Sequence, residues 1–93
     1  MDWKDVSFIM RSPQRKQLLK TLEKEPKVPV QLAESTGIDK SNVSTKLGQL
    51  RERDMVECVN PEDRKWRFYQ LTDYGHEILR KVEEIENSKQ FGS

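Results

Sequence analysis

The sequence lacks the residues that most enzymes and metal proteins use for their chemistry. It has one cysteine, Cys58, and one histidine, His76, and they fall in different predicted elements. A single cysteine cannot form a disulfide within the chain, and two isolated residues make neither a nucleophile with its base nor a set of metal ligands. Glycine-rich phosphate loops, zinc motifs and nucleotide fingerprints are also absent. We therefore predict a protein that is not an enzyme and that has no metal site and no cofactor.

Long apolar runs are missing as well. No stretch of the sequence approaches the roughly 20 apolar residues that a membrane-spanning helix needs. The first residues, 1–5, have neither the basic start nor the apolar stretch of a secretory signal. We expect a cytoplasmic protein without a membrane partner, and a chain with a single cysteine suits a reducing compartment.

The net charge is small, at +1, although 35% of the 93 residues are charged. This length fits one domain, which we place over residues 1–93. Basic residues concentrate in 11–24 and 40–53, whereas acidic residues gather in 83–86. The pattern predicts a positive face and a negative end. A generic solvated surface remains the alternative.

Two helices are expected in the first part of the chain. Ser12 can cap the first, in which leucines recur at helical spacing up to about Glu25, and Pro26 ends it. A shorter helix is predicted over 28–37. It closes at Gly37, because glycine can adopt the positive φ of a helix C-cap.

A third helix follows at once. Asp39 or Ser41 can cap it, and its apolar residues Val43, Leu47 and Leu50 recur at helical spacing, so that we expect them to face the core. The second and third helices then meet across a turn of about three or four residues. This is the geometry of a helix-turn-helix.

The second half of the sequence predicts a hairpin and one more helix. Strand-favouring residues at 55–59 and 66–71 flank a polar turn at 60–65. A last helix is expected over 72–87, followed by a frayed polar tail at 88–93. The predicted fold is mainly α with a small β-hairpin (α+β): a three-helix core, a wing and a C-terminal helix.

This order of elements resembles the winged helix-turn-helix transcriptional regulators of the broad MarR and ArsR type. Four local matches between residues 12 and 79 carry the resemblance. They are Ser12-Pro13-Gln14-Arg15 followed by Leu18-Leu19 and Leu22; Leu32-Ala33 leading to Gly37-Ile38; Val43-Ser44 with Leu47 and Leu50 leading to Met55-Val56; and Tyr69-Gln70-Leu71-Thr72-Asp73-Tyr74-Gly75. Asp54 stands where such proteins often have glycine, and the cysteine pair of metal-sensing members is absent.

The resemblance implies that the third helix lies in the major groove of double-stranded DNA. If its apolar stripe faces inward, the opposite side carries hydrogen-bonding side chains that suit base edges. The predicted base-reading residues are Ser41, Asn42, Thr45, Lys46 and Gln49. An ordinary solvated helix face is the alternative. Gly48 lies in the same helix, where glycine is unfavourable, and either a close packing contact or a close approach to DNA would explain it.

Other polar residues are candidates for contacts with the sugar-phosphate backbone. At the hairpin, Arg64, Lys65 and Arg67 are expected to reach the backbone or the adjacent minor groove, unless they only keep a hairpin tip soluble. Lys40, Arg15 and Ser44 are further candidates, whereas we expect Arg51 and Arg53 to pair with nearby acids.

The two ends of the chain suggest a homodimer. We expect segment 1–11 and helix 72–87 to form the interface, because their apolar residues exceed what a small monomer can cover. These residues are Trp3, Val6, Phe8, Ile9, Ile78, Val82 and Ile85. A two-fold dimer would bind a palindromic site. Alternatively, both ends close the core of the monomer.

The predicted function is sequence-specific binding of double-stranded DNA in transcription regulation. The rival prediction is a winged helix that binds other proteins in transcription or other macromolecular machinery, because a fold does not fix a function. Polar residues on the outer side of the third helix favour DNA. Bulky apolar residues there would have favoured a protein.

Overall fold

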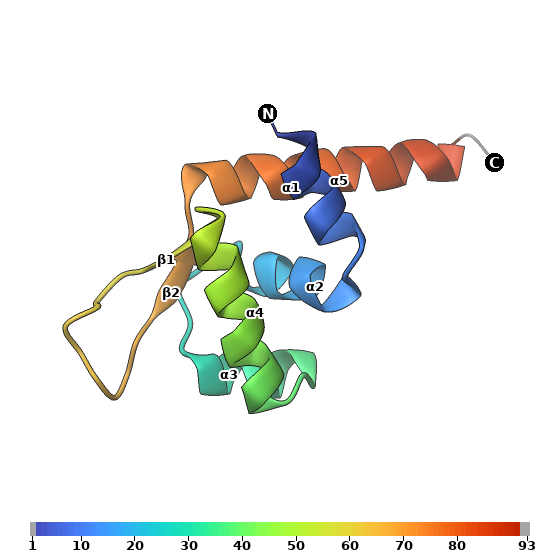
Figure 1. The fold of residues 1–93 in the computed structure, drawn as a ribbon. Helices are drawn as coiled ribbons and strands as arrows, with labels where there is room; N and C mark the ends of the chain where they lie inside the picture. The colour runs from blue at the N-terminus through green and yellow to red at the C-terminus, as the bar shows by residue number, and fades with distance from the viewer. Residues whose placement is uncertain (1, 92–93) are drawn as a thin grey trace.

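Five helices and a two-stranded hairpin make up the computed structural model, which describes residues 2–91, with side chains up to residue 88 (Figure 1). The helices are α1 (Trp3–Met10), α2 (Pro13–Leu22), α3 (Pro29–Thr36), α4 (Lys40–Glu52) and α5 (Asp73–Phe91), and the strands are β1 (Val56–Cys58) and β2 (Tyr69–Leu71). The predicted fold class is confirmed. No helix within the described residues is both long and apolar enough to span a membrane.

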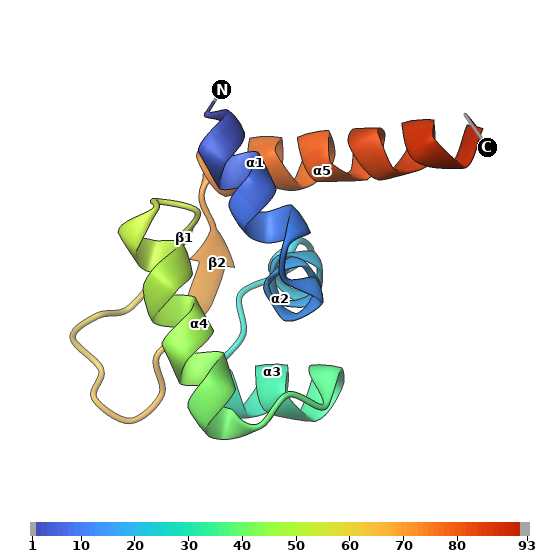
Figure 2. The ribbon, with the colours of Figure 1, turned by 45° about the vertical axis from the view of Figure 1, so that its right-hand side comes forward.

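The first helix is an element that the sequence analysis did not assign. Asp2 caps α1 by accepting a hydrogen bond from the Lys4 backbone N–H, 2.8 Å long. The helix lies across α5 and against α2, as Figures 1 and 2 both show. Val6 and Ile9 are almost completely buried there. The N-terminal segment is therefore part of the core.

The helix after it is shorter than predicted. Ser12 caps α2 as expected, because its Oγ accepts a hydrogen bond from the Arg15 N–H. The helix ends at Leu22 and not near Glu25. Glu25 directly precedes Pro26, and a residue in that position disfavours the helical conformation. The freed chain lets Lys27 pair with Tyr69 of β2 through two backbone hydrogen bonds of 3.0 and 2.9 Å.

The helix-turn-helix has the predicted caps. Gly37 ends α3 with a φ of 76°, and the Asp39 carboxylate caps α4. The third predicted helix is thus confirmed, with Val43, Leu47 and Leu50 all buried. These side chains fix which side of α4 remains outside.

The wing leaves the body of the molecule beside α4 (Figure 1). Strands β1 and β2 pair antiparallel in the register Val56 to Leu71 and Cys58 to Tyr69, so the regular ladder is shorter than predicted. Asp54, just before β1, has a φ of 61°. Aspartate tolerates this left-handed conformation better than most residues, which explains how it replaces glycine here.

The last helix is longer than predicted. Thr72 caps α5, since its Oγ1 accepts a hydrogen bond from the Gly75 N–H, 2.9 Å long. The helix then continues beyond Asn87 to Phe91. Residues 88–91 of the predicted frayed tail are therefore helical, and residues 92–93 lie outside the described part of the chain.

Candidate nucleic-acid interface

Helix α4 presents a polar side to the surface. Ser41, Asn42, Ser44 and Thr45 are exposed on it, and Lys40 is exposed at its start. Most of this side carries groups that donate or accept hydrogen bonds, and it lies opposite the buried apolar stripe. The structure therefore brings these predicted residues together on one exposed surface.

The first turn of α4 is fixed by Asp39. One oxygen of its carboxylate accepts from the Asn42 backbone N–H at 3.0 Å, and the other accepts from Asn42 Nδ2 at 2.8 Å. The backbone hydrogen bond from Asn42 lowers the pKa of Asp39 below its ordinary value, with further hydrogen bonds from Ser41 and Asn42 acting in the same direction. The Asn42 side chain is thus held in place, and its amide keeps its oxygen and a second N–H for another partner.

Gln49 is bound to another predicted residue, Arg15. Its Oε1 accepts hydrogen bonds from Arg15 Nε at 3.1 Å and from Arg15 Nη2 at 3.0 Å. Arg15 also donates to the Phe8 carbonyl oxygen at 3.1 Å and lies 3.7 Å from the centre of the Phe8 ring. Burial lowers the pKa of Arg15, and repulsion from Arg53 and Arg11 adds to the effect. The guanidinium predicted to contact phosphate is therefore engaged within the protein.

A second arginine joins the same cluster. Arg53, at the end of α4, lies 3.8 Å from the centre of the Phe8 ring and donates to Asp5 Oδ1 at 2.7 Å. The expected pairing of Arg53 with an acid is confirmed. Arg51 instead lies over the Tyr69 ring at 5.9 Å. Asp5 was not identified from the sequence, where it is one of many charged residues near the chain start.

Gly48 lies in open space. A Cβ atom added to it would meet nothing within 4 Å outside its own helical backbone. A packing contact within the chain therefore does not explain this glycine, and the packing interpretation was wrong. The residue lies on the outer side of α4, near Ser41 and Ser44 by helical rotation.

The wing tip is organised by two polar side chains. Asn60 donates to the Trp66 carbonyl at 2.7 Å and accepts from the Phe68 N–H at 2.8 Å, while Asp63 accepts from the Lys65 and Trp66 N–H groups. Those two backbone hydrogen bonds lower the pKa of Asp63.

Basic side chains are carried on this ordered tip. Arg64, Lys65 and Arg67 are all exposed, and Arg67 Nε donates to the Asp63 carbonyl at 2.9 Å. Three apolar residues share the wing: Val59, Trp66 and Phe68 are 50%, 51% and 39% exposed. The sequence analysis did not predict an exposed apolar surface there.

The predicted dimer interface is mostly inside the monomer. Five of its residues are at most 8% exposed within the single chain, namely Val6, Phe8, Ile9, Ile78 and Val82. Because α1 forms a helix that packs on α2 and α5, one chain covers the apolar surface that was expected to need a partner. The expectation that these five apolar residues need a second chain to cover them is therefore wrong. Trp3 is 59% exposed, and Ile85 is only partly buried.

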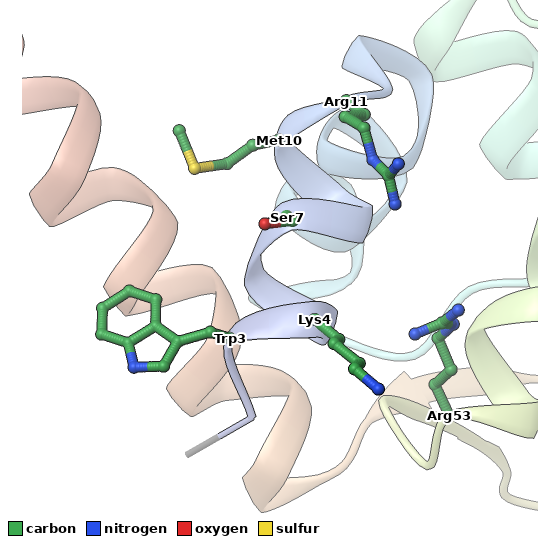
Figure 3. Close-up of a pocket in the computed structure, with 6 residues that line it drawn as sticks. All are labelled: Trp3, Lys4, Ser7, Met10, Arg11 and Arg53. Atoms are coloured by element: carbon green, nitrogen blue, oxygen red, sulfur yellow. The ribbon is translucent and has the colours of Figure 1, made fainter.

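An open hollow of about 800 Å³ lies along α1 (Figure 3). Trp3 and Met10 are on the side of α5, whereas Lys4, Arg11 and Arg53 are on the side of α4. Of its basic side chains, Lys4 belongs to α1, and Arg11 and Arg53 directly follow the ends of α1 and α4. None of the exposed residues of α4 or the wing named above lines the hollow.

The sequence matches the family described as the HVO_A0261 N-terminal domain over residues 3–90. A search among curated proteins finds no similar sequence.

Solved structures share the fold. The transcriptional regulator Tm0710 from Thermotoga maritima is 26% identical with a TM-score of 0.72 over 94% of this chain and 64% of its own. The MarR family transcription regulator SP03579 is 19% identical, with a TM-score of 0.78 over 94% of this chain and 59% of its own. FabT from Streptococcus pneumoniae, solved in complex with DNA, is 22% identical with a TM-score of 0.69 over 87% of this chain and 58% of its own.

These comparisons confirm the expected resemblance to MarR-type proteins at the level of the fold. The chain spans about three fifths of the length of these three solved structures. It belongs to the HVO_A0261 N-terminal domain family, and its fold is the winged helix-turn-helix of MarR-type regulators.

Proposed function

We propose that this protein is a transcriptional regulator that binds double-stranded DNA in a sequence-specific manner, with α4 in the major groove and the wing on the backbone or in the minor groove. One observation carries the proposal: α4 buries Val43, Leu47 and Leu50 and exposes a largely hydrogen-bonding side opposite them. A helix of this kind fits the major groove, which is wide enough to admit it and shows a distinct pattern of donors and acceptors for each base pair. FabT, which shares the fold, has been solved with DNA.

Each part of the surface has its own role. Ser41, Asn42 and Thr45 supply contacts to base edges, and Lys46 reaches either bases or phosphates. Exposed Lys40 and Ser44 contact phosphates beside the groove, and Arg64, Lys65 and Arg67 do so from the wing. Because phosphate contacts carry no sequence information, the wing supplies affinity and α4 supplies specificity. A cytoplasmic location belongs to the same proposal.

A two-fold dimer on a palindromic site is the proposed assembly. Two reading helices separated by about one turn of DNA, roughly 34 Å, would contact successive major grooves. Exposed Trp3 and the distal part of α5 around Ile85 remain available for the contact. Sedimentation equilibrium is expected to give twice the chain mass, and the Trp3→Ala change should shift the balance toward the monomer. A measured mass equal to that of a single chain at all concentrations would contradict the dimer.

Substitutions on α4 and on the wing should affect binding differently. The Asn42→Ala change should weaken binding to the preferred duplex by about 1 to 3 kcal/mol while random duplexes lose little. Arg64→Ala and Lys65→Ala should weaken binding to every duplex and lower the slope of log affinity against log salt by about 1 each. Fluorescence titrations at several salt concentrations measure both effects.

Gln17→Ala is the matched control, because it removes an exposed amide on α2 that the proposal places in neither the DNA contact nor the dimer contact. It should leave binding unchanged. Equal losses on preferred and random duplexes for Asn42→Ala would contradict base reading by α4.

A second candidate function is binding to another protein, and the exposed apolar residues of the wing favour it. Val59, Trp66 and Phe68 present apolar surface on one short hairpin, and apolar patches of this kind mark interfaces. In that case Trp66→Ser would abolish binding of the partner protein, while Asn42→Ala would leave that binding unchanged.

A further inference from the structure

The side chain of Gln49 is held in one orientation. Arginine has only hydrogen-bond donors, so the Gln49 atom that faces Arg15 must be the amide oxygen. Two guanidinium nitrogens donate to that oxygen, at 3.1 and 3.0 Å. With both lone pairs of the oxygen engaged, the NH₂ group is the part of the amide that remains for another partner.

Arg15 is itself fixed, so the arrangement exists before any ligand binds. Its Nη1 donates to the Phe8 carbonyl oxygen at 3.1 Å, and its guanidinium stacks on the Phe8 ring at 3.7 Å. Its backbone N–H is bound by the Ser12 cap of α2. A side chain held in this way by Phe8 and Gln49 loses little further conformational freedom when DNA binds.

Gln49 also lies in line with two proposed base-reading residues. Asn42, Thr45 and Gln49 follow one another at spacings of three and four, which places them along one strip of α4. The Asn42 amide is held the other way round, because its NH₂ group donates to Asp39. Asn42 therefore keeps its amide oxygen as a free acceptor, whereas Gln49 keeps its NH₂ group as a free donor.

We propose that Arg15 is a positioning residue that presents Gln49 to the major groove as a hydrogen-bond donor only, so that Gln49 selects a base whose major-groove edge offers acceptors and no donor. This inference rests on the proposed function. Guanine offers two acceptors in the major groove, and thymine offers one. The bidentate pair of glutamine with adenine needs a free amide oxygen as well, so Gln49 does not form it. Gln49 therefore departs from the usual pairing of glutamine with adenine.

Selection of bound duplexes from a random pool tests the inference. The protein is expected to recover a preferred sequence, and Gln49→Glu should change the preference at one base position per half-site. Glutamate can keep one oxygen on Arg15 and turn the other outward as an acceptor. The preference there should change from guanine or thymine to cytosine or adenine, which offer donors. On single duplexes, each mismatch should cost about fivefold in affinity, as expected for one net hydrogen bond.

Arg15→Lys should relax the preference at the same position. Lysine keeps the positive charge but lacks the planar fork of donors that engages both lone pairs of the amide oxygen. The Gln49 amide can then turn and use its oxygen to accept a hydrogen bond from adenine. Arg53→Lys is the matched control, because Arg53 also stacks on Phe8 but makes no hydrogen bond to Gln49. It should keep the original preference. Thermal unfolding of each variant verifies that it is folded.

The outcomes separate the two proposals. If no sequence is preferred by the unmodified protein, both fail. A recovered sequence whose preference is unchanged by Gln49→Glu overturns only the role of Gln49. An unchanged preference for Arg15→Lys, or the same change for Arg53→Lys, overturns the positioning by Arg15.

Discussion

At the scale of single residues, Tyr74 shows how burial and one hydrogen bond change a titration. Its hydroxyl donates to the Asp5 carboxylate, which is 7% exposed. Burial, followed by this hydrogen bond and the negative charge of Asp5, raises the pKa of Tyr74 from 10.0 to about 12. The folded protein therefore holds the phenol proton more tightly than the unfolded chain does.

The sign of the pH dependence follows from this difference. A group whose pKa is raised on folding contributes its full stability below the unfolded value, and the contribution is lost as the pH rises. The free energy of unfolding should fall between pH 10 and about 12 as Tyr74 ionises. Urea unfolding of the Tyr74→Phe variant should show a shallower fall over the same range. Equal slopes for the two proteins would contradict the assignment.

Gly48 provides a second test at this scale. Because nothing lies within 4 Å of the added Cβ, alanine should fit, and its higher helix propensity should raise the free energy of unfolding by about 1 kcal/mol. If α4 lies in a groove, the same methyl group faces DNA and should weaken binding. Denaturant unfolding without DNA measures the first effect. A loss of stability in Gly48→Ala would show that the site is not open.

At the scale of elements, the end of α4, the start of β1 and the first turn of α5 meet at Met55. The Thr72 N–H donates to the Met55 carbonyl oxygen at 3.0 Å, and Thr72 Oγ1 donates to the Asp54 carbonyl at 2.5 Å. Gly75 packs against the same backbone, so an added Cβ would lie 2.0 Å from the Met55 oxygen. Only glycine allows α5 to start this close to β1.

The Gly75→Ala variant should therefore lose about 3 kcal/mol of stability, in the range for overpacked sites, because the oxygen it meets belongs to the backbone and cannot rotate away. Gly48→Ala is the control, since the same atoms are added to a helix in open space. Thermal unfolding of both variants should give a lower midpoint for Gly75→Ala and a higher one for Gly48→Ala. An unchanged midpoint for Gly75→Ala would contradict the close contact.

Sequence patterns predicted the elements unevenly. Helix α4 was predicted well because its cap and apolar spacing are both local signals. Helix α1 was missed, although Asp2 is a recognisable cap, because its apolar residues were assigned to a partner and not to α5. Arg15 and Gln49 are 34 residues apart, and no local pattern reports such a contact. The polar strip was predictable, whereas the orientation of its amides required the fold.

At the scale of the whole molecule, charge is less segregated than the sequence predicted. Lys16 and Lys20 form ion pairs with Glu86 and Glu83 of α5. Part of the basic segment 11–24 thus pairs with the acidic residues that were expected to form a separate negative end. Such exposed pairs contribute little stability because solvent screens the charges, but they connect α2 to the far part of α5.

The shape of the molecule separates the proposed contact surface from the terminal helices. The chain measures 46 × 26 × 21 Å, and α5 extends along one end while α4 and the wing lie toward the other (Figure 2). DNA on α4 and a second chain near Trp3 would therefore occupy different parts of the surface. The central claim is that the exposed side of α4 is the side that meets DNA.

Backbone amide NMR of the labelled protein, titrated with its preferred duplex, tests that claim most directly. The largest shift changes should fall on Ser41, Thr45 and Gly48 of α4, followed by Arg64 and Lys65 of the wing, with only small changes around Asn87. A random duplex should change the wing signals more than those of α4. Changes confined to α1 and α5, with α4 unaffected by either duplex, would contradict the account.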